Sequence, residues 1–124
     1  MSVAEDQSVL SRIVGERLTG VCFVMDYLQL QFEDNTLTVL TPHDISVDGR
    51  RVQLGDLGYR DTLCDRITKV ATGLTLREEE LRISFDDGTA FTATLEVEGY
   101  AGNEAINFHF RENREMQILV IHAV

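Results

Sequence analysis

The chain has 124 residues, of which 44% are hydrophobic, and this is enough apolar material to close one core without disulfide or metal staples. Twenty-one Asp and Glu residues against eleven Lys and Arg residues give a formal charge of −10. This charge repels phosphate backbones and anionic lipid headgroups, so the composition argues against binding to nucleic acid or to a membrane. The same charge would attract a basic protein partner.

The first residues are acidic and lack both the basic region and the apolar region of a secretory signal. Apolar runs such as Ile118 to Ile121 are far shorter than a membrane span. We therefore expect a cytoplasmic protein. Cys22 and Cys64 have no CxxC partner, so in that reducing compartment we expect two free, buried thiols.

The first predicted element is a helix over about residues 6–17, because apolar residues recur there at helical spacing. Strands follow near residues 19–26, 27–33 and 36–41. Within the second strand, Leu28, Leu30 and Phe32 alternate with Gln29 and Gln31, which is typical of a strand with one face in water.

After Pro42, residues 45–54 predict a small hairpin that turns at Asp48-Gly49. A shorter helix is expected over about residues 60–66, and strands near 67–76, 80–86 and 89–97. Asp87-Gly88 predicts a two-residue hairpin turn between the last two of these strands, because Gly and Asp tolerate positive φ.

Two parts of the chain resemble each other. Residues 16–21 align with residues 65–70, and residues 28–36 align with residues 81–89 after an insertion of four residues in the second copy. The sequence therefore predicts one α+β domain over residues 1–124, built from two copies of a helix plus a three-stranded antiparallel meander, at about 6–41 and 60–97. With an inserted hairpin and a C-terminal strand pair, it should form mainly antiparallel sheet with helices packed on one face.

The C-terminal pair comprises a strand at residues 106–110 and a last strand over residues 116–124. The run Ile118 to Ile121 is apolar at every position, so both faces of the last strand should be covered. Either this strand is central in the sheet, or one face is a contact between subunits of a homodimer.

Signals for catalysis are weak. His43-Asp44 is the one adjacent acid–imidazole pair, but neighbouring residues near Pro42 rarely point at each other, and Asp44 is better explained as a turn residue. The three His residues show no metal-ligand spacing, and the sequence has no GxSxG and no P-loop. We expect no catalytic residues, no metal site and no cofactor.

Two segments combine glycines with a Tyr and charged residues, as binding loops on sheet scaffolds do. The candidate binding residues from these segments and the following strand are Tyr59, Arg60, Asp61, Tyr100, Glu104 and His109. The alternative is structural: Tyr59 packs the second helix, Asp61 caps it, and Arg60 pairs with a nearby carboxylate.

Several strings in the chain are distinctive. They include Leu18-Thr-Gly20, Asp26-Tyr27-Leu-Gln29, Gly55-Asp-Leu-Gly58-Tyr59, Asp87-Gly88 and Gly99-Tyr100-Ala-Gly102. On these strings, the stretch from Leu18 to Phe108 resembles a group of short bacterial proteins of unassigned function. The small size, acidic charge and α+β class are also similar to those of immunity-type proteins that neutralise bacterial toxins.

The leading hypothesis from the sequence is a non-enzymatic binding or interaction protein, with an immunity-like toxin inhibitor as its most concrete form. A second hypothesis is a small-ligand binder or enzyme that uses a cleft at the seam between the two copies. A third is a homo-oligomeric module that associates through its C-terminal strand.

Overall fold

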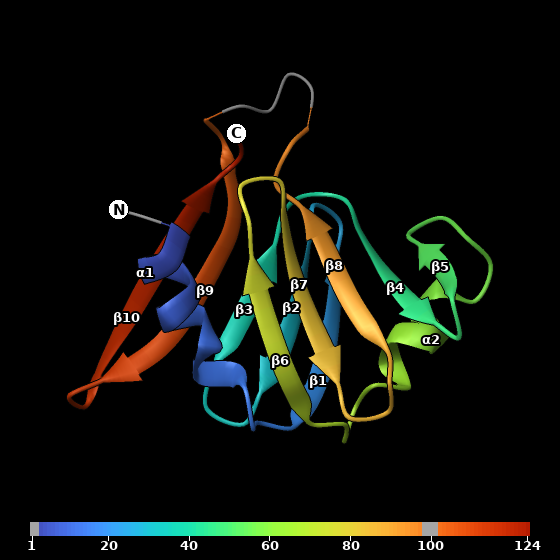
Figure 1. Cartoon of the computed structure of the whole chain (residues 1–124), viewed down its shortest axis with the longest axis horizontal. Coiled ribbons are helices and arrows are strands. Elements are labelled where there is room, and N and C mark those ends of the chain that lie inside the picture. The colour runs from blue at the N-terminus through green and yellow to red at the C-terminus, as the bar shows by residue number, and fades with distance from the viewer. Residues whose placement is uncertain (1–2, 98–101) are drawn as a thin grey trace.

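The computed structural model describes residues 3–97 and 102–124. The first half of the chain contains α1 (Val3–Leu10), the 3-10 helix η1 (Ser11–Ile13), β1 (Leu18–Val24), β2 (Tyr27–Phe32), β3 (Thr36–Val39), β4 (His43–Val47) and β5 (Arg50–Gln53). The second half contains α2 (Tyr59–Cys64), β6 (Ala71–Leu76), β7 (Glu80–Phe85), β8 (Ala90–Thr94), β9 (Glu104–Glu112) and β10 (Glu115–His122) (Figure 1). Most strands lie within a few residues of their predicted ranges.

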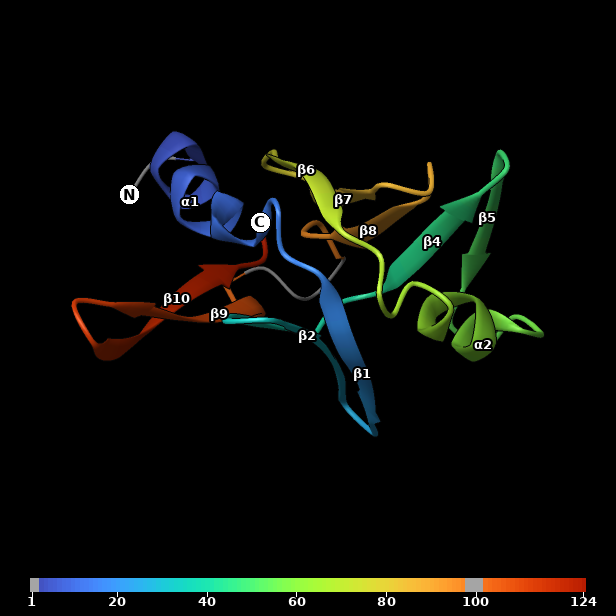
Figure 2. The same cartoon turned by 90° about the horizontal axis from the view of Figure 1, so that it is seen from below.

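The strands form two antiparallel sheets that face each other (Figure 2). One sheet has the strand order β1-β2-β3-β9-β10, and the other has the order β5-β4-β8-β7-β6. The chain crosses between the sheets after β3 and returns after β8, so β4 pairs with β8 while β9 pairs with β3. The protein is therefore α+β and mostly sheet, as the sequence predicts.

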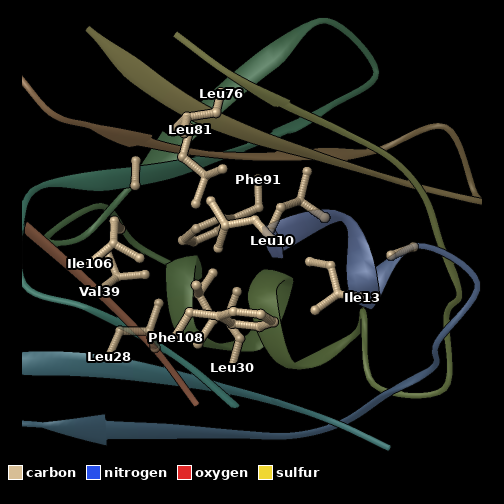
Figure 3. Packing of buried hydrophobic residues seen from close by; sticks show 14 of the residues in the cluster. Leu10, Ile13, Leu28, Leu30, Val39, Leu76, Leu81, Phe91, Ile106 and Phe108 are labelled. Carbon is tan, nitrogen blue, oxygen red and sulfur yellow. The ribbon is translucent and has the colours of Figure 1, made fainter. Parts of the chain in front are cut away.

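Alternating strand residues build the core between the sheets (Figure 3). Leu28, Leu30 and Phe32 of β2 are buried, whereas Gln29 and Gln31 lie on the other face. The same alternation in β7 buries Leu81, Ile83 and Phe85. Each fully buried Leu or Phe side chain stabilises the fold by roughly 1.5–3 kcal/mol, so this alternation is what specifies the inner face of each sheet.

The two helices lie at opposite ends of the sandwich (Figure 2). Helix α1 packs against β6, and Leu10 and Ile13 enter the core from that side. Helix α2 contacts β1, β4 and β5 at the other end. The expectation that both helices pack on one face is therefore wrong, because the strands are divided between two sheets whose lateral gaps the helices cover.

Glycine and positive φ explain the differences at the helix ends. The first helical segment ends at Ile13 rather than near residue 17, because Val14 is extended and Gly15 has a φ of +93°. After α2, residues 65–68 form a turn in which Thr68 has a φ of +85°, so β6 begins at Ala71 rather than at residue 67.

The two cysteines, Cys22 and Cys64, are half-buried, and both are free thiols.

These turns also correct the alignment of residues 16–21 with 65–70. Leu18 lies opposite Phe32 at the start of β1, whereas Ala71 lies opposite Phe85 at the start of β6. Both strands then show an irregularity in register, before Gly20 and Gly73 respectively. In strand register, Leu18 therefore occupies the place in β1 that Ala71 occupies in β6.

Two of the hairpin turns need φ > 0 at both central residues. Asp48 and Gly49 have φ values of 51° and 79°, which confirms the predicted turn of the small hairpin. Asn113 and Arg114 have φ values of 53° and 68° between β9 and β10.

The predicted two-residue turn at Asp87-Gly88 is wrong. Phe85 and Thr89 are bonded across this hairpin, so three residues, 86–88, form the loop. Gly88, with a φ of +84°, is the left-handed residue that such a loop requires at its end.

The C-terminal strand β10 lies at the edge of its sheet, so the alternative of a central strand is wrong. Leu119 and Ile121 are buried in the core. Met116 and Ile118, on the opposite face of the strand, are 53% and 58% exposed. One face of this apolar strand is thus uncovered in the single chain.

Candidate functional site

A cleft of about 630 Å³ opens at the end of the sandwich where α2 lies. Its lining comes from residues 23–28 at the β1–β2 turn, residues 39–43 in the crossover from β3 to β4, residues 53–54 at the end of β5, and Arg60 of α2. The cleft therefore lies where the chain passes from one sheet to the other. Its size is within the range of small-molecule sites in proteins.

The walls of the cleft are mainly apolar and its mouth is exposed. Leu28 and Val39 are almost fully buried at the inner side. At the mouth, Met25 is 94% exposed and Leu54 is 57% exposed. Exposed large apolar side chains gathered at one opening are typical of binding surfaces.

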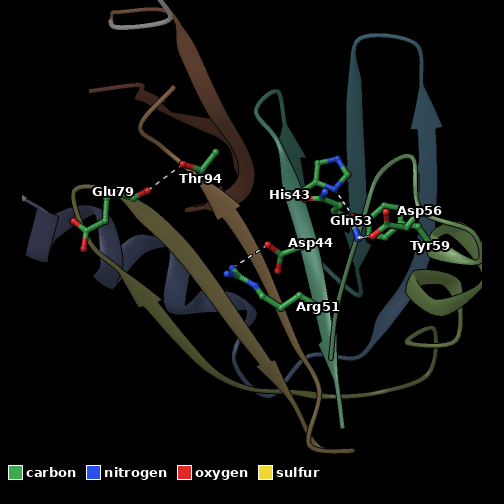
Figure 4. Close-up of polar contacts among 8 residues, drawn as sticks. All are labelled: His43, Asp44, Arg51, Gln53, Asp56, Tyr59, Glu79 and Thr94. Atoms are coloured by element: carbon green, nitrogen blue, oxygen red, sulfur yellow. Dashed lines mark hydrogen bonds and ion pairs between the residues drawn. The ribbon is translucent and has the colours of Figure 1, made fainter. Parts of the chain in front are cut away.

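His43 and Tyr59 form a buried hydrogen-bonded pair at the cleft. His43 is the first residue of β4 and lines the cleft, and its Nδ1 is hydrogen-bonded to the hydroxyl of Tyr59, the first residue of α2. Figure 4 shows the two side chains pointing toward each other. The His43 ring also contacts Phe91, with 5.7 Å between ring centroids, so it is packed between the helix and the core.

Burial determines the protonation of this pair. It lowers the pKa of His43 to about 4. It also raises the pKa of Tyr59, and the negative charge of Asp44 raises that pKa further. Both side chains are therefore neutral at neutral pH.

Asp44 does not act on His43. Neighbouring residues of a strand point to opposite faces, and Asp44 points away from His43 toward Arg51 (Figure 4). The Asp44 Oδ2 and Arg51 Nη2 atoms are 2.9 Å apart. The expectation that the two neighbours do not face each other is confirmed, but Asp44 lies within β4 and not in a turn.

Arg60 lies on the wall of the cleft. Its guanidinium carbon is 5.4 Å from the centroid of the Phe23 ring, a cation–π contact that holds the group over the aromatic face. Within the described residues Arg60 makes no ion pair, so the expected pairing with a nearby carboxylate is wrong.

Thr41, also in the lining, is only 4% exposed. Its hydroxyl oxygen is buried and has no hydrogen-bond partner in the part of the chain that the structure describes. A buried hydroxyl without a partner costs about 1–3 kcal/mol, so this position retains unused hydrogen-bonding capacity.

The predicted site residues fall into two groups. Tyr59, Arg60 and Asp61 share α2, and of these Arg60 lines the cleft. Glu104 and His109 lie on β9, which β3 and β2 separate from β1, so they do not join the α2 residues at the cleft. Tyr100 lies outside the described residues.

Of the three parts of the structural alternative for the helix, only the role of Tyr59 is confirmed. Tyr59 is 1% exposed and anchors α2, as that alternative expected. Asp61 does not cap the helix, because Gly58 occupies the N-cap position with a φ of +84° and no side-chain cap is present. Asp61 instead lies in the first turn, where a carboxylate interacts favourably with the helix dipole.

Sequence reasoning missed His43 as the partner of Tyr59, as well as the turn at residues 23–28 and Thr41. No local signal marks these residues. Within residues 3–97 and 102–124, no group of three or more His, Cys, Asp or Glu side chains could hold a metal ion. No helix in those same ranges is long and apolar enough to cross a membrane.

Comparisons with protein-family models, with curated proteins and with solved structures find no match to this chain.

Proposed function

We propose that the protein is a non-catalytic binding protein that holds a small, mainly apolar ligand in the cleft. The observation that carries this proposal is the cleft itself: about 630 Å³, with apolar walls and a few polar groups from four separate segments of the chain. Small-molecule sites combine these features. The site unites the leading hypothesis of a non-enzymatic binder with the second hypothesis of a ligand cleft.

The state of the buried pair supports binding rather than catalysis. An efficient general base near neutral pH needs a pKa close to 7. His43, with its pKa lowered to about 4, would be a poor base, and the Tyr59 hydroxyl is held in its neutral form. The pair fixes α2 to β4 and so shapes one wall of the cleft.

The proposal is tested with N-phenyl-1-naphthylamine, a neutral apolar probe whose fluorescence rises when it leaves water. We expect saturable binding to the intact chain. Gln53 lies at the cleft mouth and is exposed, so Gln53→Trp should fill the opening and weaken binding at least about tenfold without disturbing the core.

The matched control is Gln31→Trp. Gln31 is likewise exposed on a strand, but it does not line the cleft. This variant should bind the probe as the parent does, and thermal unfolding should verify that both variants fold. Failure of the parent to bind, or equal binding by both variants, would contradict the proposal.

A second candidate function is supported by the cleft mouth. The exposed side chains of Met25, Leu54 and Leu57 lie close in sequence to the exposed carboxylates Asp26 and Asp56. Apolar anchors flanked by negative charge suit a basic protein partner, in line with the immunity-type resemblance. A parent protein that binds no apolar probe would favour this candidate.

We also propose that the fold is an internal duplication with exchanged hairpins. One unit runs from α1 to β5 and the other from α2 to β10, and each hairpin, β4-β5 or β9-β10, pairs with the third strand of the other unit. This extends the predicted copies at 6–41 and 60–97, so that the inserted hairpin and the C-terminal strand pair belong to the repeat.

Matched hydrogen bonds support the duplication. The Arg17 amide donates to the Glu33 carboxylate, and at the corresponding place the Val70 amide donates to the Asp86 carboxylate. Two further pairs of hydrogen bonds match in the same way. The Thr19 hydroxyl donates to the Gln31 carbonyl, as the Thr72 hydroxyl donates to the Ser84 carbonyl. The Leu40 amide donates to the Ala105 carbonyl, as the Thr94 amide donates to the Pro42 carbonyl. The two hydrogen bonds of the last pair join the end of β3 to β9 and the end of β8 to the residue before β4, so each links one proposed unit to the other.

A further inference from the structure

Three polar side chains of the cleft lining can donate hydrogen bonds: His43, Arg60 and Thr41. The hydroxyl of Tyr59 has one hydrogen-bond partner among the described contacts, Nδ1 of His43. Since a buried hydroxyl proton needs an acceptor, the Tyr59 hydroxyl donates and the neutral imidazole carries its own proton on Nε2. The N–H that remains on the His43 ring is therefore that of Nε2, and His43 is one of the residues that line the cleft.

Arg60 contributes further donors. Its guanidinium group is held against Phe23 and has no carboxylate partner in the described parts of the chain. A guanidinium group presents five N–H donors, and its planar edge matches an oxyanion in two parallel hydrogen bonds. The unpartnered hydroxyl of Thr41 adds a third group that can donate.

We propose that the ligand of the cleft carries an oxyanion, a carboxylate or sulfonate group, at one end of its apolar body, and that Arg60 binds this group. The inference rests on the proposed function and names the chemical class of its ligand. Asp26 also lines the cleft; like Arg60 it is exposed, and it lies in the β1–β2 turn. The apolar body lies against Leu28 and Val39.

The overall charge makes this proposal a demanding one. A protein of charge −10 repels anions at long range. A preference for an anionic ligand over a neutral ligand of the same shape must therefore come from donors within the site.

The test compares two probes with the same apolar body. N-phenyl-1-naphthylamine is neutral, and 8-anilino-1-naphthalenesulfonate adds one sulfonate group. We expect the intact chain to bind the sulfonate about tenfold more tightly, because a charge-assisted hydrogen bond is stronger than the hydration it replaces. Arg60→Gln should remove this preference, so that the variant binds the two probes with equal affinity.

Arg82→Gln is the matched control, because Arg82 is an exposed arginine of β7 that does not line the cleft. It removes the same charge from the molecule and should keep the preference. The role of Arg60 would be overturned if Arg60→Gln and Arg82→Gln lost the preference for the sulfonate equally, or if the parent bound both probes with equal affinity. In both cases the cleft would remain a binding site. If neither probe binds, the proposed function itself is rejected.

Discussion

His43 loses most of its affinity for protons when the chain folds. In the unfolded chain its pKa is near 6.5, and in the folded protein burial lowers that pKa to about 4. Between these values the unfolded state binds more protons than the folded state, so stability falls as pH decreases from about 6.5 to about 4. Above pH 6.5 the contribution is fully present, and at pH 4 it has fallen by up to about 3 kcal/mol.

Denaturant unfolding of the parent and of His43→Phe, measured from pH 4 to pH 7, checks this prediction. The variant keeps an aromatic ring against Phe91 but cannot take up a proton, so the decrease in its free energy of unfolding with falling pH should be smaller by that amount. Tyr59→Phe is the control: because burial rather than the hydrogen bond lowers the pKa, it should retain the parent's pH dependence. A parent and His43→Phe with the same pH dependence would refute the prediction.

At the scale of single elements, the two hairpins with left-handed central residues offer a comparison. The β4-β5 hairpin turns through Asp48-Gly49, whereas the β9-β10 hairpin places Arg114 at a φ of 68°. A side chain at positive φ strains the backbone, and glycine does not. We expect Arg114→Gly to raise the free energy of unfolding by about 0.5 kcal/mol after the entropy of the unfolded chain is counted.

The reverse change in the other hairpin is the control. Nothing lies within 4 Å of a Cβ built on Gly49, so Gly49→Ala adds strain without a steric clash. It should lower the free energy of unfolding by about 1 kcal/mol. Urea titration of both variants measures these changes, and a destabilised Arg114→Gly protein would count against the argument.

Elements that depend on local signals were predictable from the sequence. The alternation in β2 and the turn at Asp48-Gly49 act over a few residues, and the structure has both where the sequence predicts them. The predicted end of the first helix, near residue 17, is wrong. Apolar residues at helical spacing continue to Leu18, but the helical segment ends at Ile13, before Gly15 with its positive φ. The core residues followed from the same alternation.

The cleft was not predictable in this way. The bond between His43 and Tyr59 joins residues on two elements, and it forms because the chain crosses to the second sheet before β4. Neither residue type nor spacing indicates that crossing. Of the predicted site residues, Arg60 lines the cleft, whereas Glu104 and His109 lie on β9, because sequence reasoning had no information on which strands become neighbours.

At the scale of the whole molecule, the exchanged hairpins tie the two halves of the chain together. In the first half, β4 has its sheet partner β8 in the second half, and in the second half β9 has its partner β3 in the first. Either half alone would therefore leave a three-stranded meander and a hairpin that do not share a sheet. Small β units of this kind are rarely stable alone in water.

Cutting the chain after Leu57, the fully exposed residue of the β5–α2 loop, separates the two proposed units. We expect fragments 1–57 and 58–124 to be largely unfolded when separate, and to form a 1:1 complex with native circular dichroism when mixed, because each supplies the strand that the other lacks. Sedimentation equilibrium gives the stoichiometry. A fragment that folds as a stable monomer would contradict the exchange, since its own hairpin would then have to pair with its own third strand.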